Sequence, residues 1–153
     1  MTAPITRIAP DFALIKKTEF DNIIDVRSPS EFLDDHVPGA INLPVLDDSQ
    51  RAEIGRIYKQ INPFEAKRSG AALVAQNIAG YLQNDLAKKD RDWRPLIYCW
   101  RGGQRSGAMA KIFSDIGWHS AVVEGGYKSY RKAVLNDLDY LPHKFRLIVL
   151  SGP

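Results

Sequence analysis

The chain has 153 residues, 44% hydrophobic and 25% charged, an ordinary composition for one globular domain with a hydrophobic core. Its single cysteine excludes a disulfide framework and a thiolate zinc site, and no apolar run approaches the roughly 20 residues that span a bilayer. The net charge of +3 is compatible with RNA as a partner without identifying one, and the first residues show no signal-peptide pattern, so we expect a cytoplasmic protein without a metal site.

Short strands alternate with helices in the first part of the chain. Residues 5–8 predict a strand, residues 11–17 a short helix, and residues 22–27 a compact apolar strand. In the next segment, Ser28-Pro29-Ser30-Glu31, the first serine is a helix cap, proline takes the first helical position and glutamate completes a capping box. The Pro-Gly turn within residues 36–44 then leads into another strand.

Two helices are predicted next. Residues 47–61 place four apolar side chains, Ile54, Ile57, Tyr58 and Ile61, on one face of a partly exposed helix. The segment Asn62-Pro63-Phe64-Glu65 resembles a second capping box and opens a long helix. The apolar stripe of this helix consists of Ala71, Val74, Ala75, Ile78, Ala79, Leu82 and Leu86.

The only cysteine lies in a loop rich in glycine and arginine. The apolar run of residues 96–98 predicts a buried strand that ends at Cys99, and a helix with apolar residues three and four apart follows and stops at Gly117. Gly102 and Gly103 allow a tight backbone turn between these two elements. Inward N–H groups and the helix dipole would make this loop bind anions. The predicted anion-binding loop is Cys99-Trp100-Arg101-Gly102-Gly103-Gln104-Arg105-Ser106.

This loop is expected to lower the pKa of the Cys99 thiol, because its N–H groups and the charges of Arg101 and Arg105 stabilise a thiolate. A lone cysteine is most often a small buried hydrophobe, but a core position requires neither the glycines nor the arginines. The thiolate could accept a sulfur-group atom as a persulfide or attack phosphorus. Arg105 could instead pair with a carboxylate, and Trp100 could shield the persulfide, contact a base or pack.

The last predicted elements complete the alternation. Residues 121–123 predict a strand, Gly125 and Gly126 permit a close turn, and the following helix has an apolar side of Tyr127, Tyr130, Val134 and Leu138. Alternating short apolar strands and helices predict an α/β fold with a parallel sheet covered on both faces. In such folds the site lies at the carboxyl ends of the strands, where Cys99 falls.

Three stretches resemble the rhodanese family: residues 25–44, the Cys99 loop and residues 123–127, which together span about residue 20 to residue 130 in the family's order. The resemblance implies a sulfurtransferase with a central parallel sheet of five strands, helices on both faces, and Cys99 as the residue that forms the persulfide. Asp25, Arg27 and His36 are expected to be scaffold, since buried pairs and turn hydrogen bonds account for them.

Within that family, residues 58–67, 99–106 and 125–131 resemble the N-terminal domain of the bacterial tRNA 2-selenouridine synthases. This resemblance implies a transferase that replaces the sulfur of wobble 2-thiouridine in tRNA by selenium from selenophosphate, through a geranylated intermediate made with geranyl diphosphate. No cofactor is implied for this chain. The family joins its rhodanese domain to a P-loop domain, so we expect a rhodanese-like domain over residues 1–144. Residues 145–153 would be the first strand and first glycine of a truncated P-loop domain.

One departure keeps other functions open. Cys99 and Arg105 have the Cys-x5-Arg spacing of cysteine phosphatases, including one with a rhodanese fold, whereas common rhodaneses have a loop one residue shorter. A wider loop suits phosphate or selenophosphate, and a phosphatase would also need a general acid, for which Asp47, Asp48 and Glu124 are candidates. The alternatives to the tRNA enzyme are a generic rhodanese sulfurtransferase, a Cys-x5-Arg phosphatase and a non-catalytic module that binds a partner.

Overall fold

The computed structural model describes residues 2–11, 19–146, 148–149 and 152. Its five strands form one sheet in the order β1-β5-β4-β2-β3, and every neighbouring pair is parallel, which confirms the predicted fold class. In chain order the elements are β1 (Thr6–Ile8), β2 (Asn22–Asp25), α2 (Pro29–Asp34), β3 (Ala40–Asn42), α3 (Asp48–Gln60), α4 (Pro63–Gln83), β4 (Pro95–Tyr98), α5 (Gln104–Ile116), β5 (Ala121–Val123), α6 (Gly126–Tyr140) and the 3-10 helix η2 (Leu141–Lys144).

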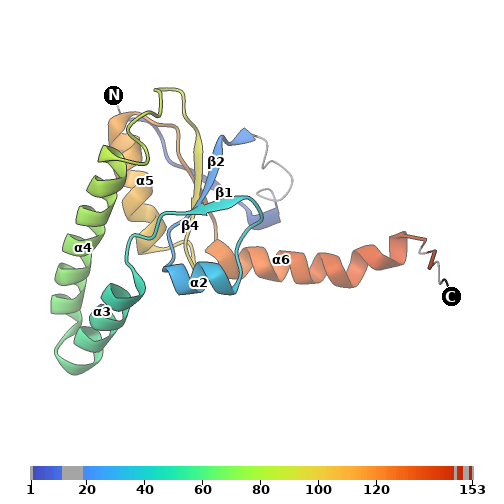
Figure 1. The fold of residues 1–153 in the computed structure, drawn as a ribbon, viewed down its shortest axis with the longest axis horizontal. Helices are drawn as coiled ribbons and strands as arrows, with labels where there is room; N and C mark the ends of the chain where they lie inside the picture. The colour runs from blue at the N-terminus through green and yellow to red at the C-terminus, as the bar shows by residue number, and fades with distance from the viewer. Residues whose placement is uncertain (1, 12–18, 147, 150–151, 153) are drawn as a thin grey trace.

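Helices cover both faces of the sheet. Successive side chains of a strand point to opposite sides, so β4 contributes side chains to the hydrophobic cluster on each face. On one face Ile97 of β4 belongs to a buried cluster with Ile78 of α4 and Phe113 of α5. On the other face Tyr98 of the same strand belongs to a second cluster with Tyr127 of α6. β4 lies in the middle of the sheet, so whatever follows its last residue is held by both layers (Figure 1).

α3 and α4 form a helical hairpin at one side of the molecule (Figure 1). Both helices begin where predicted: Asp47 accepts a hydrogen bond from the Gln50 N–H at 2.7 Å, and Asn62 accepts one from the Glu65 N–H at 2.8 Å. The capping box predicted at Asn62 is only half formed, because the Glu65 carboxylate pairs with Arg68. The apolar face of α3 stays largely open, however, and the Tyr58 side chain is 55% exposed.

The predicted apolar stripe of α4 is partly wrong. The side of α4 that is buried includes Ala66, Gly70 and Ile78. Gly70 lies on this side because Ile54 of α3 packs against it, and a Cβ on Gly70 would be 3.6 Å from the Ile54 side chain. Alanine tolerates water as well as burial, so it does not mark the inner face of a helix. The alanines of the predicted stripe, Ala71, Ala75 and Ala79, are exposed.

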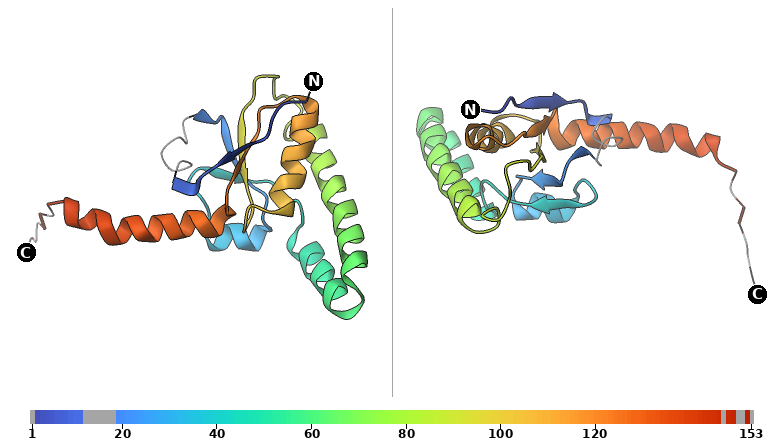
Figure 2. Two further views of the ribbon diagram at one scale, coloured as in Figure 1. Left: turned by 180° about the vertical axis from the view of Figure 1, so that it is seen from behind. Right: turned by 90° about the horizontal axis from the view of Figure 1, so that it is seen from above.

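α6 extends away from the sheet toward the C-terminus (Figure 2). Tyr127 and Tyr130 are buried as predicted, but Leu138 is exposed, because this part of α6 has passed the edge of the sheet. The strand expected from residue 145 onward does not form in the described part of residues 145–149, and the helix expected over residues 11–17 lies outside the described residues apart from Asp11. The division at residue 144 therefore stays a prediction. Within the described ranges, no helix is long and apolar enough to cross a membrane.

Candidate functional site

Cys99 directly follows β4 at the carboxyl edge of the sheet. Its backbone carbonyl accepts a hydrogen bond from the Tyr127 N–H at 2.8 Å, and the next carbonyl, of Trp100, accepts one from the Lys128 N–H at 3.0 Å. The first turn of α6 thus holds the loop. The Cys99 side chain is only 3% exposed, so the sulfur sits at the bottom of the loop rather than on the surface.

Two groups at the start of α5 contact the sulfur. The N–H of Gly103, the residue that caps α5, donates to Cys99 Sγ at 3.3 Å, and the Ser106 Oγ lies 3.3 Å from the same atom. The Ser106 side chain is fully buried in the first turn of α5. Cys99 Sγ therefore faces the N-terminus of a 13-residue helix, where unpaired N–H groups and the helix dipole stabilise negative charge.

These contacts set the ionisation of the thiol. Burial raises the pKa of Cys99, whereas the Ser106 hydroxyl and the backbone N–H groups that face the sulfur lower it. The hydrogen bonds dominate, so the pKa of Cys99 lies below its ordinary value of 9.0, as the sequence predicted. The lowering comes mainly from hydrogen bonds to the Ser106 hydroxyl and to backbone N–H groups of the loop, rather than from the guanidinium charges that the sequence suggested.

Two glycines let the loop and the start of α6 touch backbone to backbone. Gly102 and Gly126 have φ angles of +64° and +60°, in the left-handed region that favours glycine. A Cβ on Gly126 would lie 2.3 Å from the Cys99 carbonyl oxygen, and one on Gly102 would lie 2.6 Å from the Val123 carbonyl oxygen. Neither position has room for a side chain.

Arg105 pairs with a carboxylate, which is one of the two arrangements that the sequence allows. Its Nη1 lies 2.9 Å from Glu31 Oε2, and Arg51 Nε lies 3.3 Å from the same oxygen. Burial raises the pKa of Glu31, but the hydrogen bond and charge of Arg105 and the charge of Arg51 bring it below its ordinary value of 4.5. Sequence reasoning assigned Glu31 only to helix capping, and it does accept a hydrogen bond from the Ser28 N–H at 3.3 Å.

The other predicted loop residues point outward. The Trp100 side chain is 36% exposed, with its ring centroid 5.7 Å from that of Tyr127, and Arg101 is exposed. Gln104 begins α5 and, together with Arg105, lines a cavity beside the loop. Among the described residues, no group of His, Cys, Asp or Glu could hold a metal ion.

The three residues expected to be scaffold have structural partners. Arg27 Nη2 lies 2.7 Å from Asp25 Oδ2, and both side chains are buried. The Arg27 guanidinium carbon also lies 4.0 Å from the centroid of the Tyr127 ring. His36 stacks on Phe32, and its Nδ1 is 2.8 Å from the Phe32 carbonyl oxygen. These contacts confirm a supporting role for the residues before the loop.

The all-parallel five-stranded sheet, with a cysteine loop directly after its middle strand, places the chain among α/β proteins whose reactive group lies at the carboxyl edge of the sheet. Residues 12–133 match the family described as Rhodanese-like domain, and the chain belongs to this family. It is 36% identical over 132 residues to the tRNA 2-selenouridine synthase of Nitrosomonas europaea, covering 86% of this chain and 34% of the relative. It is 34% identical over 130 residues to the synthase of Psychromonas ingrahamii, covering 85% and 35%. The chain thus spans about a third of the length of these relatives.

Solved structures show the same fold. The N-terminal domain of a Clostridium difficile 630 protein, named for ATP/GTP binding, is 35% identical, with a TM-score of 0.67 over 86% of this chain and 99% of its own. A rhodanese-related protein from Thermoplasma volcanium is 19% identical, with a TM-score of 0.54 over 84% of this chain and 92% of its own. The second similarity concerns the fold alone.

Proposed function

We propose that this chain is the rhodanese module of a tRNA 2-selenouridine synthase, in which Cys99 carries the sulfur or selenium atom used when wobble 2-thiouridine becomes 2-selenouridine. The observation that carries the proposal is the contact of Cys99 Sγ with the Gly103 N–H and the Ser106 hydroxyl, which lowers the pKa of the thiol. The relatives named for this reaction support the particular enzyme. In the whole enzyme, tRNA, selenophosphate and geranyl diphosphate would be the substrates.

The loading step is a displacement at sulfur or selenium. With thiosulfate, the Cys99 thiolate attacks the outer sulfur, a new S–S bond forms, and the S–S bond of thiosulfate breaks with its electron pair leaving on sulfite. With selenophosphate, attack on selenium forms an S–Se bond and breaks the Se–P bond. The electron pair then stays on phosphorus, which leaves as phosphite after taking up a proton. The N–H groups of the loop would stabilise the anionic terminal atom in either product.

The phosphatase alternative has less support from the site. Attack on phosphorus would need a cation over the phosphate oxygens, but Arg105 is held by Glu31. It would also need a general acid with a raised pKa. Instead, a hydrogen bond from the Gln50 N–H lowers the pKa of Asp47, and one from the Ser30 hydroxyl lowers the pKa of Asp48. Both carboxylates therefore favour the ionised form, which is unsuited to protonate a leaving group. The third candidate, Glu124, is exposed directly after β5 and stays a candidate.

Intact-protein mass spectrometry tests this function. After incubation with thiosulfate, the wild-type chain should gain the mass of one sulfur atom that dithiothreitol removes, and Cys99→Ala should gain nothing. After incubation with selenophosphate, we expect one selenium atom, identified by its broad isotope pattern. A phosphoryl group on Cys99 has nearly the same mass but lacks that pattern, and its appearance would favour the phosphatase. Absence of any adduct with both donors would refute the transferase.

A further inference from the structure

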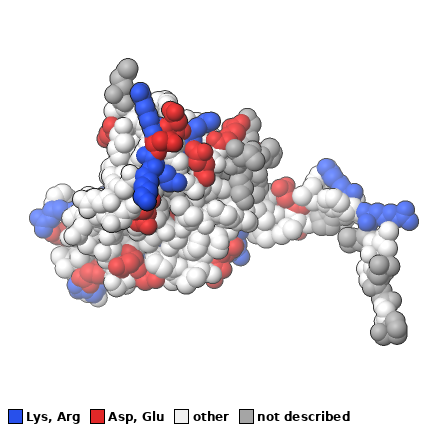
Figure 3. Space-filling view, turned by 45° about the horizontal axis from the view of Figure 1, so that its top comes forward, with Lys and Arg blue, Asp and Glu red and all other residues white. Residues whose placement is uncertain are grey.

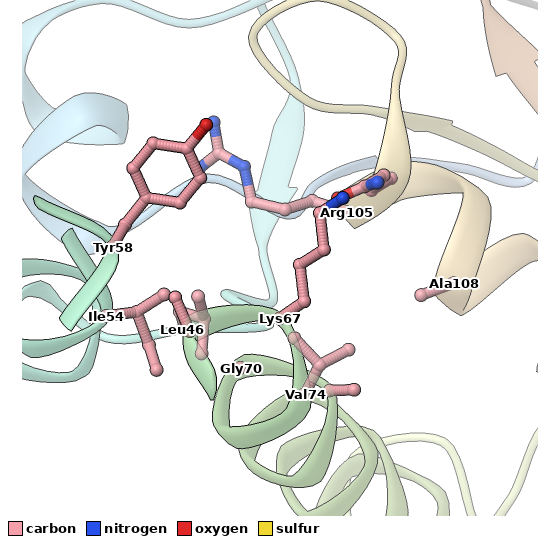
Figure 4. A pocket seen from close by; sticks show the side chains of 11 residues that line it. Leu46, Ile54, Tyr58, Lys67, Gly70, Val74, Arg105 and Ala108 are labelled. Atoms are coloured by element: carbon pink, nitrogen blue, oxygen red, sulfur yellow. The ribbon is translucent and has the colours of Figure 1, made fainter. Parts of the chain in front are cut away.

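A cavity beside the Cys99 loop is not needed for the loading step proposed above. It has a volume of about 450 Å³, which falls within the range of small-ligand sites. It lies between the α3–α4 hairpin and the first turn of α5 (Figure 4). The side chains of Tyr58, Lys67 and Arg105 reach into this space from three different helices.

The cavity combines apolar walls with a few polar groups. Small and aliphatic residues leave a smooth surface without hydrogen-bonding groups on their side chains, namely Leu46, Ile54, Ala66, Gly70, Ala71, Val74 and Ala108. The polar groups are the Tyr58 ring, the Lys67 ammonium, the Gln104 amide and the Arg105 guanidinium. A ligand that fills the cavity therefore needs apolar faces, a hydrogen-bonding edge and a negative charge nearby.

A nucleobase has the faces and the edge. The Tyr58 side chain is 55% exposed, so it is open to stacking by a base, an interaction that is favourable for every base. The Gln104 side chain carries an amide donor and a carbonyl acceptor, and its position is exposed at the start of α5. Such an amide can pair with the donor and acceptor edge of a pyrimidine. A purely aliphatic ligand would use neither group.

Lys67 supplies the positive charge. Two arginines of the same hairpin already have carboxylate partners. Arg56 Nη2 lies 2.6 Å from Glu53 Oε1, and Arg68 Nη2 lies 2.5 Å from Glu65 Oε2. No carboxylate partner for Lys67 is found in the part of the chain that the structure describes. Its ammonium is therefore available to a phosphate, the group that dominates contacts between proteins and nucleic acids.

The cavity is also adjacent to the reactive sulfur. Gly103, whose N–H contacts Cys99 Sγ, directly precedes Gln104 in the chain. Consecutive Cα atoms lie about 3.8 Å apart, so the wall of the cavity begins one residue after the glycine whose N–H contacts the sulfur. A base bound there would bring its RNA segment to the edge of the loop.

We propose that this cavity binds an unstacked base of a single-stranded RNA segment, with the base stacked on Tyr58 and the adjoining phosphate on Lys67. The proposal rests on the proposed function, because the relatives are named for a reaction on tRNA, and it adds the surface through which RNA reaches the loop. RNA-binding proteins commonly recognise single-stranded segments by stacking their unpaired bases on aromatic side chains.

Binding of an anticodon stem-loop RNA with 2-thiouridine at the wobble position, measured by fluorescence anisotropy, tests the proposal. Tyr58→Ala should weaken binding between about fivefold and a hundredfold, and Tyr58→Phe should restore most of the affinity, because the ring and not the hydroxyl stacks. Lys67→Ala should weaken binding and reduce the slope of log affinity against log salt by about one. Tyr140→Ala and Lys132→Ala, which remove an exposed aromatic ring and an exposed lysine of α6, are the controls and should bind as the wild type does.

Binding by Tyr58→Ala within twofold of wild type, or no binding by the wild-type chain, would overturn the proposal. The proposal would also be overturned if Tyr58→Ala and Lys67→Ala lost affinity for decyl phosphate but kept the wild-type affinity for RNA. The cavity would then be a site for an amphiphile. Circular dichroism checks that each variant is folded. Sulfur loading of Cys99 is measured separately on the wild-type chain, so a failure of the transferase chemistry is distinguishable from a failure of the RNA site.

Discussion

The Glu31 carboxylate binds the guanidinium of Arg105, the arginine of the Cys-x5-Arg sequence, and so fixes its position. This carboxylate is mostly buried, and it accepts contacts from Arg105 and Arg51 on the same oxygen. Because the Arg105 guanidinium is bound to α2, the charge that would clamp a tetrahedral phosphate over the sulfur is taken up elsewhere. The stabilisation of the Cys99 thiolate then comes from hydrogen bonds within the loop.

Replacing Glu31 should therefore change how the loop handles phosphate. In Glu31→Gln, Arg105 loses its charged partner and becomes free to bind an anion above Cys99. We expect inorganic phosphate to protect Cys99 from iodoacetamide at roughly tenfold lower concentration than in wild type, since charge-assisted hydrogen bonds are the stronger ones. Glu53→Gln, which breaks an exposed pair with Arg56 on α3, is the control. Equal protection in all three proteins would show that Glu31 does not restrain Arg105.

The pH dependence of the Glu31 pair follows from the same contacts. The pKa of Glu31 is below 4.5 in the folded chain, so the ionised form stabilises the fold above that pH, and this contribution is lost as the pH falls through the lowered value. Urea unfolding at a series of acid pH values measures this contribution. Between pH 4.5 and lower pH, the free energy of unfolding should fall less in Glu31→Gln than in the wild type. An unchanged acid limb in the variant would mean that the pair contributes nothing to stability.

At the level of residues, local chemistry was predictable and its long-range partners were not. The position of Cys99, the capping groups and the lowered pKa of the thiol depend on segments adjacent in sequence. The Arg105–Glu31 pair joins residues 74 positions apart, and no pattern in the sequence connects them. Likewise, the proximity of Tyr58 and Lys67 to the start of α5 arises only when the α3–α4 hairpin folds back beside it.

The Cys99 loop and the first turn of α6 form one element, joined by backbone hydrogen bonds and by contact at Gly102 and Gly126. A methyl group on Gly126 would overlap the Cys99 carbonyl and two further backbone nitrogens, and the chain there cannot shift without opening the loop. Gly107 of α5 offers a matched comparison, since a Cβ there would meet nothing within 4 Å.

Gly126→Ala should destabilise the protein by about 3 kcal/mol or more, because both the positive φ and the backbone contact oppose a side chain. Gly107→Ala, on an exposed helical position, should stabilise it by about 0.5–1 kcal/mol. Chemical denaturation of the two variants measures both effects. If the two variants have the same free energy of unfolding, the contact between the loop and α6 does not constrain the fold.

Between residues 22 and 140 the types and order of the elements were predicted correctly from periodicity and capping residues, but the strand expected from residue 145 does not form in its described part, and the buried faces of two helices were predicted wrongly. The alanines of α4 fit the apolar stripe yet face water, because their small side chains carry little information about burial. Leu138 continues the apolar side of α6 beyond the edge of the sheet. A periodic pattern indicates a helix and does not show where the rest of the protein ends.

For the whole molecule, net charge is a weak guide to RNA binding. On the face shown in Figure 3, Lys and Arg are interspersed with Asp and Glu rather than gathered in one broad patch. Recognition of RNA would then depend on a specific site such as the cavity beside the loop. The sheet contributes by placing β4 in the middle, so that the loop after it is braced from α5 on one side and from α6 on the other.

The lowered pKa of Cys99 depends on the hydrogen bonds that the folded loop makes to the sulfur, and the pH dependence of its alkylation is the most direct test. The chain contains one cysteine, so the rate of reaction with iodoacetamide reports this thiol alone. We predict that the alkylation rate of the folded chain rises with a midpoint at lower pH than that of the chain unfolded in urea, and that Ser106→Ala raises the folded midpoint. A folded midpoint equal to or above that of the unfolded chain would contradict a thiolate stabilised by the loop.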